Sequence, residues 1–124
     1  MIKEDYVSFE TAKLLKKKGF NEDSWFHYDA NGDIVMRGYR LNMPEDIPAW
    51  TLQMAMKWLR QEKHYYIQVM LDGWACGDHS GYYVVIQKTD SDFEMMLSDA
   101  VDEVFYQTYE EACEAAIKYC LNLI

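Results

Sequence analysis

The clearest hydrophobic pattern in the chain lies between positions 50 and 63. Its polar positions, Gln53, Lys57 and Arg60, recur at the spacing of one helical face. The other positions are mostly apolar, and they include Leu52, Met54, Ala55, Met56, Trp58 and Leu59. A helix with so little polar surface is normally covered on more than one side. We therefore predict a central helix that begins near position 50 or 51, ends near position 63 and has other elements packed around it.

Two further helices are indicated by residues that cap helix ends. Ser8 is a good N-cap for a helix over residues 8–19, and Gly19 is placed to end it. Thr108 and Glu111 fit the capping box at the start of a last helix. Apolar residues then recur at spacings of three and four, which is typical of one buried face: Tyr109, Ala112, Cys113, Ala116, Ile117, Cys120 and Leu121.

Four segments between these helices favour β-strands. Residues 24–28 and 34–37 are β-prone and flank Asn31-Gly32, which is the strongest short signal for a hairpin. Residues 65–71 and 82–88 are almost continuously apolar, as in central strands. The loop that joins these last two strands, residues 72–81, contains three glycines.

The segment from 90 to 107 is less clear. Asp90-Ser-Asp92 indicates a turn, residues 93–97 fit either a strand or a helical turn, and residues 104–106 fit an edge strand. Short connections between the other strands favour antiparallel pairing. We predict one α+β domain over residues 1–124 in the order α-β-β-α-β-β-(β)-α, with a mostly antiparallel sheet packed by about three helices.

The net charge of −9 changes the picture of possible partners. Lys and Arg provide the affinity for phosphates, so this charge argues against direct nucleic-acid binding and against an anionic membrane surface. It leaves open a basic protein partner, or a protein that mimics nucleic acid. The odd number of cysteines indicates reduced thiols. With no signal peptide and no apolar run near the ~20 residues of a membrane span, we expect a cytoplasmic protein.

Residues 72–81 hold the one tight cluster of potential ligands or catalytic groups, Cys76, Asp78 and His79. Cys76 and His79 could supply half of a zinc site, but no second pair stands at a suitable spacing. Cys76 could also be a nucleophile with His79 as its base, although a hairpin loop holds a nucleophile poorly. The alternative is a glycine-rich turn whose polar side chains face water. We therefore predict no metal, no cofactor and no confident catalytic residue.

Two surpluses in the composition suggest contacts with another protein. Acidic residues without intervening Lys or Arg gather late in the chain, at Asp99, Asp102, Glu103, Glu110, Glu111 and Glu114. The tyrosine doublets at 65–66 and 82–83 each place one ring on either face of a sheet. A solvated acidic face and rings covered by helices are the simpler explanations. As candidate interaction residues we take Trp74, Tyr65, Tyr83, Glu110 and Glu114.

Three stretches together resemble a family of small uncharacterised proteins from gut anaerobes and their phages or mobile elements. They are SFETAKLLKKKGF at 8–20, TLQMAMKWLR at 51–60 and YEEACEAAIKYCL at 109–121. The resemblance covers a little under a third of the chain. It implies a cytoplasmic accessory protein, and it brings no activity, cofactor or site residue.

These observations favour a non-enzymatic interaction module, accessory to a phage or mobile element, which acts through protein contacts. It could self-associate as a homodimer, or act as an acidic decoy for a basic partner. The rival hypothesis is a small enzyme or ligand-binding domain whose site is the 72–81 loop, built on Cys76, Asp78 and His79.

Overall fold

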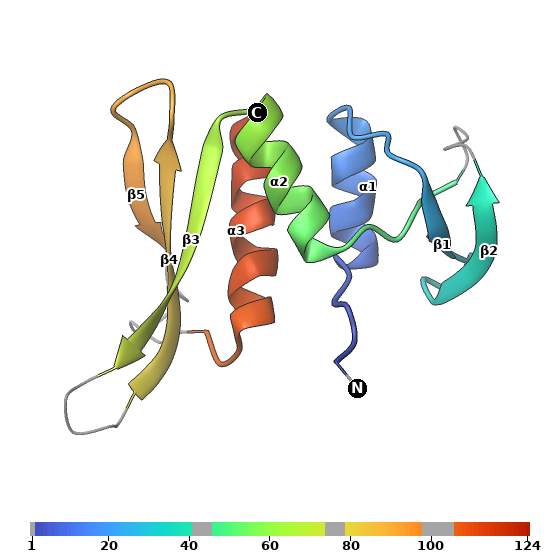
Figure 1. Ribbon diagram of the computed structural model, residues 1–124, viewed down its shortest axis with the longest axis horizontal. Coiled ribbons are helices and arrows are strands. Elements are labelled where there is room, and N and C mark those ends of the chain that lie inside the picture. Colours follow the sequence, from blue (N-terminus) through green and yellow to red (C-terminus); the bar gives the residue numbers. More distant parts are fainter. Residues whose placement is uncertain (1, 41–45, 74–78, 98–105) are drawn as a thin grey trace.

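The computed structural model describes residues 2–40, 46–73, 79–97 and 106–124. Within them the chain forms three helices and five strands (Figure 1). The helices are α1 (Phe9–Lys17), α2 (Leu52–Glu62) and α3 (Tyr109–Leu123). The strands are β1 (Ser24–Tyr28), β2 (Ile34–Arg40), β3 (Tyr65–Gly73), β4 (His79–Lys88) and β5 (Glu94–Leu97). The predicted α+β class and the order of elements are confirmed, and residues 94–97 form a strand.

The strands form two antiparallel sheets where the sequence predicts one. β1 pairs with β2, and β3, β4 and β5 form a second sheet in that order. The three helices stand between the two sheets (Figure 1). The sheets stay apart because β1 uses its second edge for the segment that leads to α2. The N–H of Tyr28 donates to the Ile47 carbonyl, and the N–H of Ala49 donates to the Phe26 carbonyl, each at 2.9 Å.

The same pairing buries His27. The alternation of His27 with Trp25 along the strand predicts a half-buried or surface imidazole, but His27 is 1% exposed. β2 covers one edge of its strand, and a bridge to Pro48 covers the other. Nε2 lies 3.0 Å from the Ser24 carbonyl, while Nδ1 has no hydrogen-bond partner among the described residues. His27 is therefore a core residue of the hairpin.

Each helix begins with a hydroxyl cap. The hydroxyl of Ser8 accepts the N–H of Thr11 at 3.2 Å, as predicted from the sequence. Thr51 caps α2 through the N–H of Met54 at 3.1 Å. The predicted cap of α3, Thr108, accepts the N–H of the third helical residue, also at 3.1 Å. These bonds satisfy N–H groups that have no partner within a helix.

We expect Thr108→Ala to lower the free energy of unfolding by about 1 kcal/mol, because it removes this acceptor from the start of α3. Thr108→Ser is the matched control, since it keeps the hydroxyl. Urea unfolding followed by circular dichroism measures both variants. Equal losses in the two variants would show that the methyl group, and not the hydrogen bond, carries the effect.

α3 is the helix on which the core is built. Its small and aliphatic residues, which are Ala112, Cys113, Ala116, Ile117, Cys120 and Leu121, are all fully buried. The helix contacts α1, α2, β3 and β4. α2 crosses in front of it (Figure 1) and exposes the predicted polar stripe of Gln53, Lys57 and Arg60. Small side chains along α3 allow this close approach on several sides.

The three-stranded sheet turns one face to the helices. Tyr65 and Ile67 of β3 and Val84 and Ile86 of β4 are buried on that face. The two strands pair in register from Tyr65↔Lys88 to Asp72↔Gly81, so they extend into the predicted 72–81 loop. Of the predicted edge strand at 104–106, the described part is Tyr106. It makes an antiparallel bridge to Tyr82 of β4, with both N–H···O distances 2.8 Å.

Candidate functional site

The predicted loop site lies mostly outside the described residues. Cys76, Asp78 and Trp74 belong to the segment 74–78, which the structure does not describe. His79 is the first residue of β4, where it pairs with Gly73. The enzyme hypothesis therefore stays a sequence-based expectation.

The other two cysteines are core residues. Cys113 and Cys120 are both buried on α3. Burial raises the pKa of the Cys113 thiol to about 11 and that of the Cys120 thiol to about 12. A reactive cysteine needs the opposite shift, toward the thiolate. Within the described part of the chain, moreover, no three His, Cys, Asp or Glu residues gather in a way that could hold a metal ion.

The tyrosine doublets divide between the two faces of the sheet, as predicted. Tyr65 is 8% exposed and packs in the core, whereas Tyr66 is 40% exposed on the opposite face. Tyr83 lies on the same face as Tyr66 and is half-buried. The candidate Tyr65 is thus largely buried, and Tyr66 is the outward ring of its doublet.

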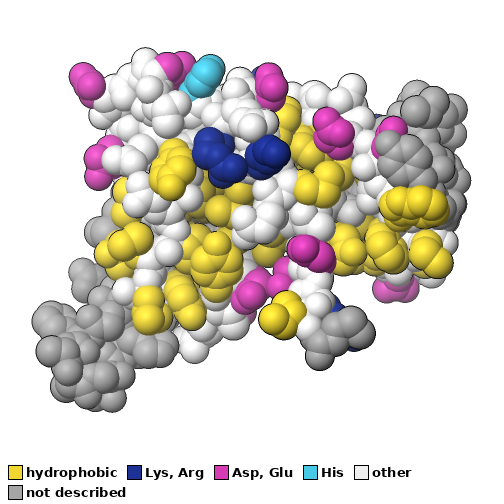
Figure 2. All heavy atoms as spheres, in the orientation of Figure 1, with side chains coloured by type: hydrophobic (Ala, Val, Ile, Leu, Met, Phe, Trp, Pro, Cys, Tyr) yellow, Lys and Arg dark blue, Asp and Glu magenta, His cyan; other side chains and the backbone are white. Residues whose placement is uncertain are grey.

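The fold brings together two acidic segments that are far apart in the sequence. Glu4 and Asp5 of the N-terminal segment lie beside Glu110 at the start of α3, around a hollow of about 240 Å³. A neighbouring hollow of about 410 Å³ shares Asp5 and Glu110 and adds Glu111. Acidic side chains gather at the lower centre of the face in Figure 2.

We call the two hollows together the acidic groove. Its described lining consists of Ile2, Lys3, Glu4, Asp5, Tyr6, Ser8, Leu52, Gln53, Tyr106, Tyr109, Glu110, Glu111 and Glu114. Five of these residues are acidic and one is basic, and three are tyrosines. None of these described residues is a His or a Cys, so the groove offers carboxylates and aromatic rings and no thiol or imidazole.

Glu114 lines the groove but has a structural role of its own. One carboxylate oxygen, Oε1, accepts the backbone N–H of Ser8 at 3.0 Å and the hydroxyl of Thr11 at 2.7 Å. This joins α3 to the start of α1. The other oxygen, Oε2, is buried and has no hydrogen-bond partner among the described residues. Burial first, and then the charge of Glu114, raise the pKa of Tyr28 to about 12.

Glu110 has the more open position of the two predicted acidic residues. It is exposed and lines both hollows of the groove. Tyr109 beside it is 38% exposed. Burial is the main cause that raises the pKa of Tyr109, and the Glu110 carboxylate adds to it. The sequence could not show that Asp5 and Tyr6 join this surface, because nothing local links them to residues a hundred positions away.

Comparison of the chain with protein-family models, with curated proteins and with solved structures gives no significant match. The helices of the described part are all too short or too polar to cross a membrane. The acidic groove is therefore the surface whose chemistry can point to a function. Carboxylates beside tyrosine rings attract a cation through charge and through the negative faces of the rings.

Proposed function

We propose that this chain is a non-enzymatic interaction module that binds a basic segment of a partner protein in the acidic groove. The observation that carries the proposal is that Glu4 in one hollow and Glu111 in the other adjoin Asp5 and Glu110, which line both hollows of the acidic groove. A Lys or Arg side chain placed there would meet carboxylates and the rings of the groove together. The net charge of −9 would also attract a basic partner over a distance.

The arrangement of the carboxylates favours a compact basic segment over the decoy form of the same proposal. A mimic of nucleic acid needs negative charges spread along a band with the spacing of phosphates. The acidic groove instead gathers its charges around adjoining hollows that also contain Tyr6, Tyr106 and Tyr109. The resemblance of the three helical stretches supports, as part of this proposal, a cytoplasmic role accessory to a phage or mobile element.

The test is the binding of a fluorescent peptide rich in Lys and Arg, followed by anisotropy. The double variant Glu110→Gln/Glu111→Gln replaces two carboxylates of the groove, both at the start of α3, with neutral amides. We expect it to weaken binding about tenfold, since each partly screened ion pair contributes on the order of 0.5–1 kcal/mol. Added salt should weaken the binding of the wild-type chain as well.

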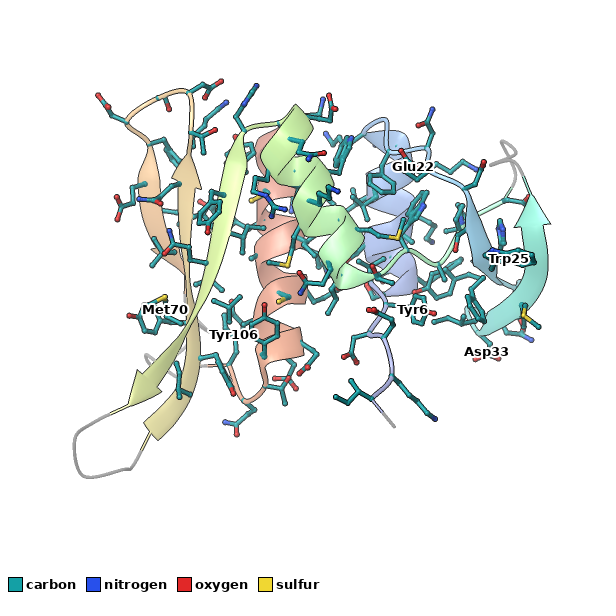
Figure 3. All side chains as sticks on the ribbon, in the orientation of Figure 1. Tyr6, Glu22, Trp25, Asp33, Met70 and Tyr106 are labelled. Carbon is teal, nitrogen blue, oxygen red and sulfur yellow. The ribbon has the colours of Figure 1, made fainter. Side chains whose placement is uncertain are left out.

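The matched control is Asp33→Asn/Asp92→Asn, which changes the net charge equally at two exposed positions outside the groove. Figure 3 shows Asp33 on the β1–β2 hairpin, away from α3. The control should bind the peptide almost as the wild type does. If both double variants lose the same affinity, bulk charge and not the groove attracts the peptide, and the proposal is wrong. It is also wrong if the wild-type chain shows no saturable binding.

A further inference from the structure

The three-stranded sheet has one face that no helix covers in the described structure. The helices contact the face of Tyr65, Ile67, Val84 and Ile86, so the alternate residues point the other way. These outward residues are Tyr66, Gln68 and Met70 of β3 and Tyr83, Val85 and Gln87 of β4. In Figure 3, Met70 lies on the side of β3 that is turned away from the helices.

The β3 and β4 part of this outer face is uncharged in a strongly acidic chain. None of its six residues on β3 and β4 is Asp, Glu, Lys or Arg. The amide of Gln68 donates to Gln87 across the strands at 2.8 Å. Gln87 in turn donates to the carboxylate of Glu94 at 3.4 Å, so a charge borders this face on β5, the strand farthest from β3. Figure 2 shows hydrophobic side chains gathered over this sheet, on the left of the view.

In the described part of the chain, β3 also has an edge to which no strand is paired. Its backbone pairs with β4 on one side, and no strand or isolated bridge among the described residues pairs with the other side. Edge strands are usually protected by charges, Pro or short length. β5, the opposite edge, has four residues and begins with Glu94, but residues 65–71 of β3 contain no charge and no Pro. Figure 1 shows the β3–β4 hairpin projecting beyond the helices.

We propose that the occupant of this edge is a second copy of the chain, with β3 pairing antiparallel to β3 of its partner. Two copies of net charge −9 repel each other. The electrostatic repulsion is smallest where two uncharged surfaces meet. A basic partner would gain no ion pair there. Seven paired residues per strand extend over about 23 Å and join the two sheets into one.

The uncharged run also fixes the register of the pair. A two-fold axis through Gln68 is the arrangement that overlaps residues 65–71 completely, because 68 is their midpoint. Gln68 then faces its own copy, and Tyr66 faces Met70 of the other chain. Any shifted register brings Asp72 at one end, or His64 and Lys63 at the other, against the partner strand. A closed two-fold contact of this kind stops at the dimer.

Mass measurement by chromatography with light scattering provides the first test. The wild-type chain should have twice the chain mass of 14.7 kDa at high concentration. Gln68→Lys places two like charges together on the axis and should give a monomer. The matched control, Gln53→Lys, makes the same charge change on the exposed stripe of α2 and should stay a dimer. A wild-type monomer at every concentration, or a dimeric Gln68→Lys, would overturn the proposal.

Disulfide formation tests the register without a charge in the sheet. In a Cys76→Ser background, Gln68→Cys should oxidise to a covalent dimer, because facing residues of antiparallel strands have Cα atoms about 4.5–5.5 Å apart. Tyr66→Cys alone should not form a covalent dimer, since residue 66 of one chain and residue 66 of the other would lie about 13 Å apart along the strands. A mixture of Tyr66→Cys and Met70→Cys chains should cross-link. Equal cross-linking by Gln68→Cys and Tyr66→Cys would show that the pairing is wrong.

The effect of salt distinguishes the dimer interface from the acidic groove. Dimerisation should strengthen as salt screens the repulsion between two acidic chains, whereas binding of a basic peptide should weaken. The dimer does not depend on the proposed function. Gln68→Lys should keep peptide binding in the groove, and Glu110→Gln/Glu111→Gln should keep the dimer.

Discussion

Trp50→Ala should lower the free energy of unfolding by about 3–5 kcal/mol, the range for removing a large buried aromatic ring. Trp50 is fully buried, and its ring meets that of Phe20 edge-on at a centroid distance of 4.5 Å. Its indole N–H also donates to the Glu22 carbonyl at 2.9 Å. The substitution therefore leaves a cavity and an unpaired carbonyl in one step. The free energy of unfolding of a small domain is only about 5–15 kcal/mol in total. The Trp50→Ala variant should therefore keep little stability or be unfolded.

Trp25→Ala is the matched control, with the same change of side chain at an exposed position. Trp25 is 55% exposed on β1, in the β1–β2 hairpin (Figure 3). Removal of the Trp25 ring should lower the free energy of unfolding by about 1 kcal/mol or less. Guanidinium unfolding of both variants measures the difference. Similar losses would mean that Trp50 is not the buried ring that joins α2 to the segment before β1.

The region around Trp50 shows which features the sequence predicts well. Its neighbours predict a helix start at position 50 or 51, and the structure begins α2 at Leu52 after the cap at Thr51. Caps are visible in the sequence because they are hydrogen bonds between residues three positions apart. The same local reasoning gave Ser8, Thr108 and Gly19 correctly, and Gly19 has the positive φ of +108° that ends α1.

The features that the sequence did not show depend on contacts between distant segments. His27 is buried because β1 pairs with the segment around Pro48. That pairing keeps the first hairpin apart from the other three strands, so one predicted sheet became two. In the sequence, Glu114 is one more acidic residue of a predicted helix. In the structure, its carboxylate accepts hydrogen bonds from Ser8 and Thr11 at the start of α1. Of the residues that line the acidic groove, Glu110 and Glu114 were interaction candidates from the sequence, but Asp5 and Tyr6 were not.

The second large effect is expected in alkaline solution. The pKa of Cys113 rises from the ordinary 9.0 to about 11 in the fold, and that of Cys120 rises to about 12, in both cases mainly through burial. The folded chain therefore holds these protons more tightly than the unfolded chain does. This contribution to stability is fully present below pH 9.0, the unfolded pKa, and it is lost as the pH rises toward the folded values.

The size of the loss follows from the two shifts. At pH 10 each thiol would be mostly ionised in the unfolded chain and still mostly protonated in the fold, which costs on the order of 1 kcal/mol per thiol. The free energy of unfolding should therefore fall by roughly 2–3 kcal/mol between pH 8 and pH 10. Tyr28, whose pKa rises from 10.0 to about 12, extends the decline to higher pH. Urea unfolding at a series of pH values measures the slope.

Variants assign the slope to particular side chains. Cys120→Ala keeps a small side chain in the core but removes one titration, so about half of the loss between pH 8 and pH 10 should disappear. Cys113→Ala/Cys120→Ala should leave a decline that begins only near pH 10, where Tyr28 takes over, and adding Tyr28→Phe should remove most of that. A wild-type profile that stays flat to pH 10 would mean that the thiols of α3 reach solvent, which contradicts their burial against the sheet.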